Sequence, residues 1–147
     1  MPRGHLYIND KDAYIEWGVF LDETALSTLM TPPALKEFPV NKYRTRNGSR
    51  IMTNNPRIDS RDITLALNMT ANNKETFLSN YAKFCDEVLA KGRLTIRTKF
   101  LPNVYYRFVY ISCTQFSQFV RQMAKFSLKL TEPDPTNRGK TDNNIEV

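Results

Sequence analysis

The sequence contains little of what enzymes and metalloproteins use. It has one histidine, His5, and two cysteines, Cys85 and Cys113, among 147 residues. Catalysis by a Ser–His or Cys–His pair needs a partner beside the base, and no pattern in the sequence indicates one. A zinc site is disfavoured for a similar reason, because structural zinc takes four cysteine or histidine ligands. We therefore expect no catalytic residue, no metal and no cofactor, in a protein that is not an enzyme.

Two short stretches begin or end like ligand-binding loops and then depart from the pattern. The stretch "RGKT" at 138–141 ends like a phosphate-binding loop, but Asp134 stands where that pattern requires glycine. The stretch from Asp10 begins like a calcium loop, but Ile15 occupies the obligatory glycine position.

Two cysteines are also too few for a disulfide framework, and we expect both to be small buried apolar residues.

Long apolar runs are also missing. No run approaches the roughly 20 residues that a membrane-spanning helix needs. The first ten residues have only Leu6, Tyr7 and Ile8 as an apolar core, which is too short for a signal peptide. We expect no membrane segment, and a chain that is synthesised and kept in a cytoplasm unless it leaves by lysis or through a dedicated machine.

The overall composition is that of a globular protein. Apolar residues make up 41% and charged residues 24% of the chain, and this length is typical of one domain. The net charge is +6, which permits a nucleic-acid partner without requiring one. We expect one domain over residues 1–132 and a flexible tail over residues 133–147, which is rich in proline, asparagine and charge.

Alternating apolar and polar residues predict most of the regular structure. This period of two predicts strands at 62–69, 93–100, 104–113 and 123–130, after a short opening strand at 5–9. The strand at 104–113 is apolar on both faces, so we expect it to be central. Its aromatic residues could form an open stacking surface for bases, but packing in the core is the favoured interpretation. Residues 115–122 are either the end of this strand or a connecting loop.

Residues 72–92 form the clearest predicted helix. Asn72 and Glu75 resemble a capping box, and Gly92 stands where a left-handed C-terminal cap is expected. Its apolar residues recur at spacings of three and four, giving one apolar face. A shorter helical turn near 24–30 ends before Pro32 and Pro33. The predicted class is α+β, mainly β: a β-sandwich or open barrel flanked by one amphipathic helix.

A long basic stretch interrupts this order. The stretch "KYRTRNGSRIMTNNPRIDSR" spans 42–61 and contains one acidic residue, Asp59. Its six basic residues are Lys42, Arg44, Arg46, Arg50, Arg57 and Arg61. Asn47-Gly48 is a turn signal, so residues 41–58 are expected to form a projecting hairpin or a long loop.

Two interpretations of this loop are open. It could contact another protein subunit, with arginines suited to paired hydrogen bonds with carboxylates. It could instead serve a small nucleic-acid-binding module. If all six basic residues met phosphates, log affinity would fall against log salt with a slope of about −5.

Three stretches carry a resemblance to small bacteriophage and prophage tail proteins. The chain resembles the N-terminal domain of siphophage distal tail proteins, and tail-tube proteins, in "LYINDKDAYIEWGVFL", "NGSRIMTNNPRIDSRDITLAL" and "KLTEPDPTNRG". This resemblance implies a β-sandwich flanked by one helix and a structural role at the tail tube or the distal tail hub. It also implies rings, usually hexamers, around a lumen that DNA crosses, and contacts with other tail proteins through the long loop. The expected location is the virion tail, after synthesis in the bacterial host cytoplasm.

Overall fold

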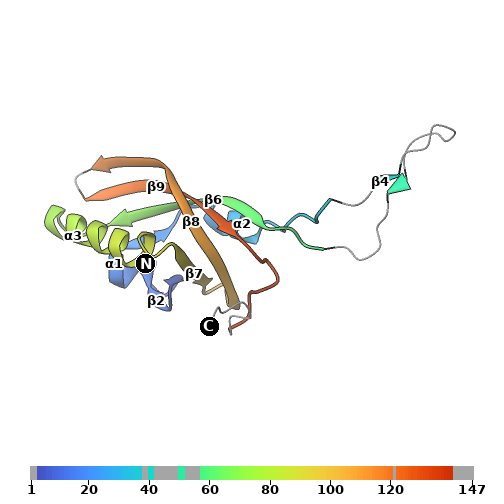
Figure 1. Cartoon of the computed structure of the whole chain (residues 1–147). Coiled ribbons are helices and arrows are strands. Elements are labelled where there is room, and N and C mark those ends of the chain that lie inside the picture. Colours follow the sequence, from blue (N-terminus) through green and yellow to red (C-terminus); the bar gives the residue numbers. More distant parts are fainter. Residues whose placement is uncertain (1–2, 38–39, 42–49, 52–56, 121, 141–147) are drawn as a thin grey trace.

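One strongly curved antiparallel sheet forms the body of the molecule (Figure 1). The computed structural model describes residues 3–37, 40–41, 50–51, 57–120 and 122–140. Across the sheet, the seven strands are β2 (Lys11–Asp12), β1 (Leu6–Ile8), β7 (Arg93–Thr98), β8 (Leu101–Val120), β9 (Met123–Glu132), β6 (Arg61–Thr70) and β3 (Val19–Leu21). The predicted α+β, mainly β class is confirmed, and the sheet has the curled form of an open half-barrel.

The alternation in the sequence becomes the buried face of this sheet. In β6 and β9 every second side chain is buried, as their alternation predicted. Leu65 lies opposite Leu128, and Leu67 lies opposite Phe126, so the two inward rows pack as cross-strand pairs. The buried members of these two strands are Arg61, Ile63, Leu65, Leu67, Met69, Ala124, Phe126, Leu128, Leu130 and Glu132.

The predicted helix is present, and two short helices precede it. α1 (Ala13–Trp17) and α2 (Ala25–Met30) precede α3 (Lys74–Phe84). α3 begins one residue later than predicted, because the side chain of Asn73 accepts a hydrogen bond from the Thr76 amide at 2.7 Å. α3 is the predicted flanking helix, and α2 coincides with the helical turn predicted near 24–30. α1 is an additional short helix.

A π-helical turn, η1 (Cys85–Leu89), ends the long helix. The Ala90 amide donates to the Cys85 carbonyl at 2.8 Å, which is the five-residue spacing of a π-turn. This turn places Glu87 so that its carboxylate accepts a hydrogen bond from the Trp17 indole at 3.0 Å. Gly92 then takes the predicted left-handed conformation, and its carbonyl accepts from the Tyr110 amide at 2.7 Å.

Gly18 connects α1 to β3 at a point where only glycine fits. Its φ is +70°, and a Cβ at this position would lie 2.0 Å from the Thr70 carbonyl oxygen. The two backbones approach this closely because the Thr70 amide donates to the Gly18 carbonyl at 2.9 Å. The bend therefore holds β3 against the end of β6.

The hairpin of β8 and β9 is longer than the sequence predicted. β8 extends to Val120, so residues 115–120 are the end of the strand and not a connecting loop. Beyond Val109, β8 pairs only with β9 among the described strands, and its register shifts at three places. Cys113 is exposed and Cys85 is half-buried, so the expectation that both cysteines are buried is wrong.

Candidate assembly surfaces

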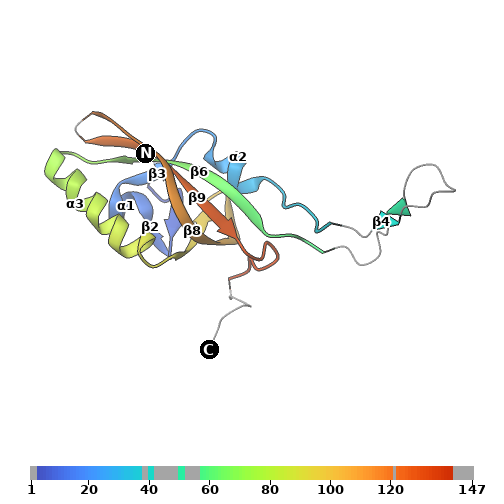
Figure 2. The same ribbon diagram turned by 45° about the horizontal axis from the view of Figure 1, so that its top comes forward.

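An antiparallel ribbon leaves the body at the start of β6. We call residues 31–37 and 57–60 the arm base. Leu35 and Ile58 form a bridge, the Lys36 amide donates to the Arg57 carbonyl at 2.7 Å, and the Asp59 amide donates to the Ala34 carbonyl at 2.9 Å. Figures 1 and 2 show this ribbon running away from the seven-stranded sheet. Further along, β4 (Val40–Asn41) pairs with β5 (Arg50–Ile51) as a separate two-stranded sheet.

The arm base carries two large apolar side chains that its own chain leaves in solvent. Leu35 is 48% exposed and Ile58 is 41% exposed. A two-stranded ribbon with no further covering is marginally stable in water by itself. This surface is therefore a candidate for contact with another molecule.

The six predicted interface residues fall into different environments. Lys42, Arg44 and Arg46 lie outside the described residues, and only the backbone of Arg50 is described, in β5. Arg57 is exposed on the arm base, as the interface prediction requires. The interface role of these five residues stays a prediction.

Arg61 corrects the prediction, because it belongs to the core and not to the loop surface. It is the first residue of β6 and is 6% exposed. Its Nε donates to the Glu132 carboxylate at 3.0 Å, and its Nη1 donates to the carbonyls of Leu29 at 2.8 Å and Thr31 at 2.7 Å. Arg61 cannot pair with a neighbouring subunit while it makes these bonds.

Glu132 is the centre of what we call the buried charge cluster: Arg61, Glu132 and Arg138. Glu132 is fully buried, and Arg138 donates to its two oxygens at 2.9 Å and 2.7 Å. The aromatic rings of β8 lie against both guanidinium groups: Arg61 is 5.6 Å from the ring centre of Tyr106, and Arg138 is 4.8 Å from it. These ring faces offset part of the excess positive charge of two arginines on one carboxylate.

Burial and pairing shift the pKa values of this cluster in different directions. Burial lowers the pKa of Arg61, whereas the hydrogen bond to Glu132 raises the pKa of Arg138. Burial also raises the pKa of Tyr106. Arginine stays protonated in proteins, so the cluster holds two cations on the one Glu132 side chain, with the neutral phenol of Tyr106 beside them. The cluster lies in the core at the end of the sheet from which the arm base leaves.

The segment after β9 packs beside β8. The Tyr105 amide donates to the Arg138 carbonyl at 2.8 Å, and Asn137 is 5% exposed. Arg107 donates from Nη1 to the Asn137 carbonyl at 3.1 Å. Residues 133–140, the first part of the predicted flexible tail, are thus held against the sheet, and residues 141–147 lie outside the described residues.

At the opposite end of the sheet, α3 and β8 form an exposed apolar surface. We call Tyr81, Cys113 and Phe116 the apolar patch. Tyr81 is 41% exposed and Phe116 is 48% exposed, and their ring centres lie 5.7 Å apart. These residues surround a cavity of about 170 Å³. The other residues that line it are Met69, Phe84, Cys85, Leu89, Tyr110, Phe126 and Leu128.

The two phenols at this cavity, Tyr81 and Tyr110, are uncharged at neutral pH. The neighbouring Cys85 thiol is the main cause of a raised pKa at Tyr81, and burial is the main cause of a raised pKa at Tyr110. A phenol whose pKa lies above its ordinary value of about 10 stays protonated at pH 7. The surface therefore suits an apolar side chain better than an ion.

The described residues give no indication of a catalytic centre. The rings of His5 and Phe100 meet edge to face, with their centres 6.0 Å apart. No group of three metal-ligating side chains occurs in the described ranges. A larger cavity of about 510 Å³ lies beside Trp17, but its one carboxylate, Glu87, already accepts the Trp17 hydrogen bond. None of the helices in the described part of the chain is long and apolar enough to cross a membrane.

The aromatic residues Tyr105, Tyr106 and Phe108, in the first half of β8, do not form an open stacking surface. Tyr106 and Phe108 are buried, which confirms the core-packing interpretation for these two. Tyr105 is half-buried on the opposite face, beneath Arg97, whose guanidinium lies 5.5 Å from its ring centre. Arg97 also lies 4.2 Å from the ring centre of Tyr7.

The architecture has counterparts among solved structures. No family profile and no curated protein matches the sequence. The crystal structure of phage SPP1 Dit, described as a paradigm of the hub adsorption apparatus in phages that infect Gram-positive bacteria, matches 89% of this chain with a TM-score of 0.62. The chain has the fold of a phage distal-tail protein. This confirms the resemblance stated from the sequence.

A second phage structure supports the same fold. The phage P2 baseplate, described in its activated conformation with Ca, contains a chain that matches 84% of this one with a TM-score of 0.50. Sequence identity is 14% in both comparisons, so the likeness is one of fold. This chain spans 50% of the SPP1 Dit chain and 43% of the P2 baseplate chain.

Proposed function

We propose that this chain is a non-enzymatic structural protein of a phage or prophage tail, located at the distal tail hub. The observation that carries the proposal is the fold shared with SPP1 Dit over 89% of this chain. Both similar structures come from a hub or a baseplate, which favours this location over the tail tube. The protein would be made in the bacterial host cytoplasm and incorporated into the virion tail.

Copies of this chain assemble head to tail into a ring, in this proposal a hexamer. The support is an arm base that projects from one end of the body with exposed apolar side chains. A head-to-tail contact uses two different surfaces of each copy, and it closes into a ring when the rotation between copies allows. Other tail proteins would stack on the ring, and DNA would cross its lumen without sequence preference.

Sedimentation velocity over a range of concentrations, followed by negative-stain electron microscopy, tests this proposal. We expect a concentration-dependent shift from monomer to one larger species, and ring-shaped particles with sixfold symmetry. The same measurement with neighbouring tail proteins added would detect a ring that forms only in their presence. A strictly monomeric chain under every one of these conditions would contradict the proposal.

The alternative is a small nucleic-acid-binding module, favoured by the net charge of +6 and the exposed Arg57. Because Arg61 is buried, five of the six basic residues remain for phosphates. The slope of log affinity against log salt would then be about −4.5 if all five engaged. A DNA titration at two salt concentrations distinguishes this module from a tail protein. Tight binding of DNA by a monomer at physiological salt would favour the nucleic-acid-binding module.

A further inference from the structure

We propose that the apolar patch of one copy receives the arm base of a second copy, with Leu35 or Ile58 inserted above the cavity. This inference rests on the proposed function, because it assumes that copies associate. It adds the surface that receives the arm. The contact is apolar, between residues that the chain itself leaves exposed at two separate places.

The patch has the form of a receiving site. The mouth of its cavity consists of exposed side chains, whereas its floor includes the buried residues Phe84, Phe126 and Leu128. An incoming apolar group would therefore contact the core directly. The volume of about 170 Å³ is comparable with apolar cavities of about 150 Å³ that bind a benzene-sized molecule. One branched aliphatic side chain is of suitable size.

The arm base has the form of an inserting element. Leu35 and Ile58 lie directly opposite each other as a bridged pair on a narrow ribbon, and both are more than 40% exposed. Exposed aliphatic residues on a ribbon that stands away from the body gain little from their own chain. Burying one such side chain in a partner removes apolar area from water and favours association.

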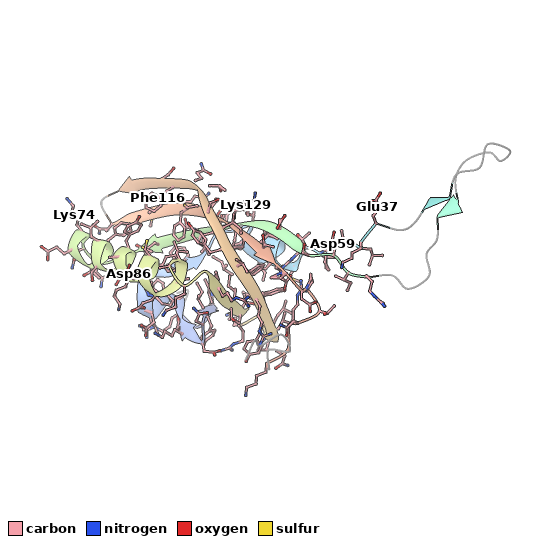
Figure 3. All side chains as sticks on the ribbon, in the orientation of Figure 1. Glu37, Asp59, Lys74, Asp86, Phe116 and Lys129 are labelled. Carbon is pink, nitrogen blue, oxygen red and sulfur yellow. The ribbon has the colours of Figure 1, made fainter. Side chains whose placement is uncertain are left out.

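The two surfaces lie at opposite ends of the molecule. Figure 3 places Glu37 and Asp59, which belong to the arm base, at one end, and Phe116 near Lys74 of α3 at the other. A copy therefore cannot insert its own arm base into its own patch in the conformation described. The same separation allows each copy to give its arm base to the next copy and receive one from the previous copy, as a head-to-tail ring requires.

Side-chain insertion fits this site better than the addition of a long strand. The edge of β8 beyond Val109 has no strand partner other than β9 in the described residues, which by itself would allow strand addition. However, the β8 register shifts between Tyr110 and Ser112 and again between Cys113 and Gln115. Such irregularities interrupt a continuous hydrogen-bond ladder.

Cross-linking between two differently tagged populations tests the contact. One population carries Ile58→Cys together with Cys113→Ser, and the other keeps the native, exposed Cys113. A short bismaleimide should link the two populations, and mass spectrometry should locate the link between positions 58 and 113. The matched control replaces Ile15, which is 59% exposed on α1, with cysteine in the same Cys113→Ser background. It should give no link to Cys113.

A second measurement removes the patch without introducing a cysteine. Phe116→Ser should weaken self-association at least about tenfold by sedimentation, as for a central aromatic contact in an interface. Phe100→Ser is the matched control, because Phe100 is similarly exposed, at 54%, but does not line the cavity. It should leave association unchanged, and thermal melting of both variants checks their folding.

The outcomes separate this inference from the proposed function. If rings form but the link is absent and Phe116→Ser associates like the unmodified chain, the receiving site is wrong and the tail function stands. If the Ile15→Cys control links to Cys113 as strongly as Ile58→Cys, the contact is nonspecific and the inference is also wrong. If no self-association occurs at all, both proposals fail.

Discussion

The two ends of the sheet are closed in different ways. At the arm end, the buried charge cluster closes the core with directed hydrogen bonds from Arg61 and Arg138 to Glu132. At the α3 end, rings close it: Phe84 lies 5.7 Å from both Trp17 and Phe126. Directed bonds hold one geometry, whereas ring packing leaves a cavity of about 170 Å³.

The contacts at the arm end fix where the arm base leaves the body. Arg61 donates to the carbonyls of Leu29 and Thr31, just before the arm base turns away from the body. Pro32 and Pro33 follow at once and restrict the backbone further. The direction of the arm is therefore set by the cluster. At the α3 end the contacts that close the core are ring contacts beside an open cavity.

The largest effect is expected from removing a ring at the α3 end. Phe84→Ala should lower the free energy of unfolding by about 4 kcal/mol, because the site is 2% exposed and a cavity already lies beside it. Chemical denaturation measures this loss. Leu78→Ala on the same helix, at a side chain that is 50% exposed, is the control and should cost less than about 1 kcal/mol. Equal losses would mean that Phe84 does not organise this end.

The next effect is expected from the carboxylate at the arm end. Glu132→Gln should lower the free energy of unfolding by about 3 kcal/mol, because it leaves two guanidinium groups near a neutral amide in a buried site. Denaturant unfolding measures it, with the exposed Glu75→Gln as the control. A loss below about 1 kcal/mol would show that the aromatic rings alone can hold the two charges.

Two arginines four positions apart separate stability from assembly. Arg61→Gln should lower the free energy of unfolding by about 2 kcal/mol, because it removes charged hydrogen bonds to Glu132 and to two carbonyls. Arg57→Gln, at an exposed site, should change stability by less than about 0.5 kcal/mol. Thermal melting compares the two variants, and similar melting temperatures would contradict the assignment of Arg61 to the core.

The smallest effect is expected from a surface pair that contrasts with the buried cluster. The Asn68 amide and the Lys125 ammonium hold the pKa of Asp22 below its ordinary value. Ionised Asp22 therefore adds stability above its unfolded-state pKa of about 4, and this is lost as the pH falls through the lower folded-state value. Asp22→Asn should lower the free energy of unfolding by about 0.5 kcal/mol at pH 7 and leave it unchanged at strongly acidic pH, as denaturant unfolding at the two pH values would measure. A cost independent of pH would contradict the role of its charge.

Local patterns in the sequence predicted the elements whose signals are local. Alternation over ten residues of β6 and of β9 predicted the buried faces of both strands, and the signals at either end predicted α3 to within one residue at its start. α1 has only five residues, which is less than two helical turns, so no periodicity could reveal it. Its cap by Asp12 becomes recognisable only in the structure.

The misassignment of Arg61 shows what the sequence could have revealed. Its partner Glu132 is 71 positions away, and no local signal joins them. However, Arg61 has the same parity as the inward residues Ile63 and Leu65, and Glu132 has the same parity as Leu130. Extending the two alternating rows by one step would have placed both charges inside. Their direct cross-strand pairing depends on the register between β6 and β9, which the sequence alone does not provide.

The π-turn from Cys85 to Leu89 widens the end of the long helix by one residue. Because the wider turn takes up the extra residue, a deletion of one residue here would restore ordinary helical spacing while the chain beyond it keeps its orientation. The change would fall on the turn itself, from which the Glu87 carboxylate accepts the hydrogen bond of the Trp17 indole, and changed tryptophan fluorescence would report it. The widened turn is thus the part of the long helix that joins it to α1.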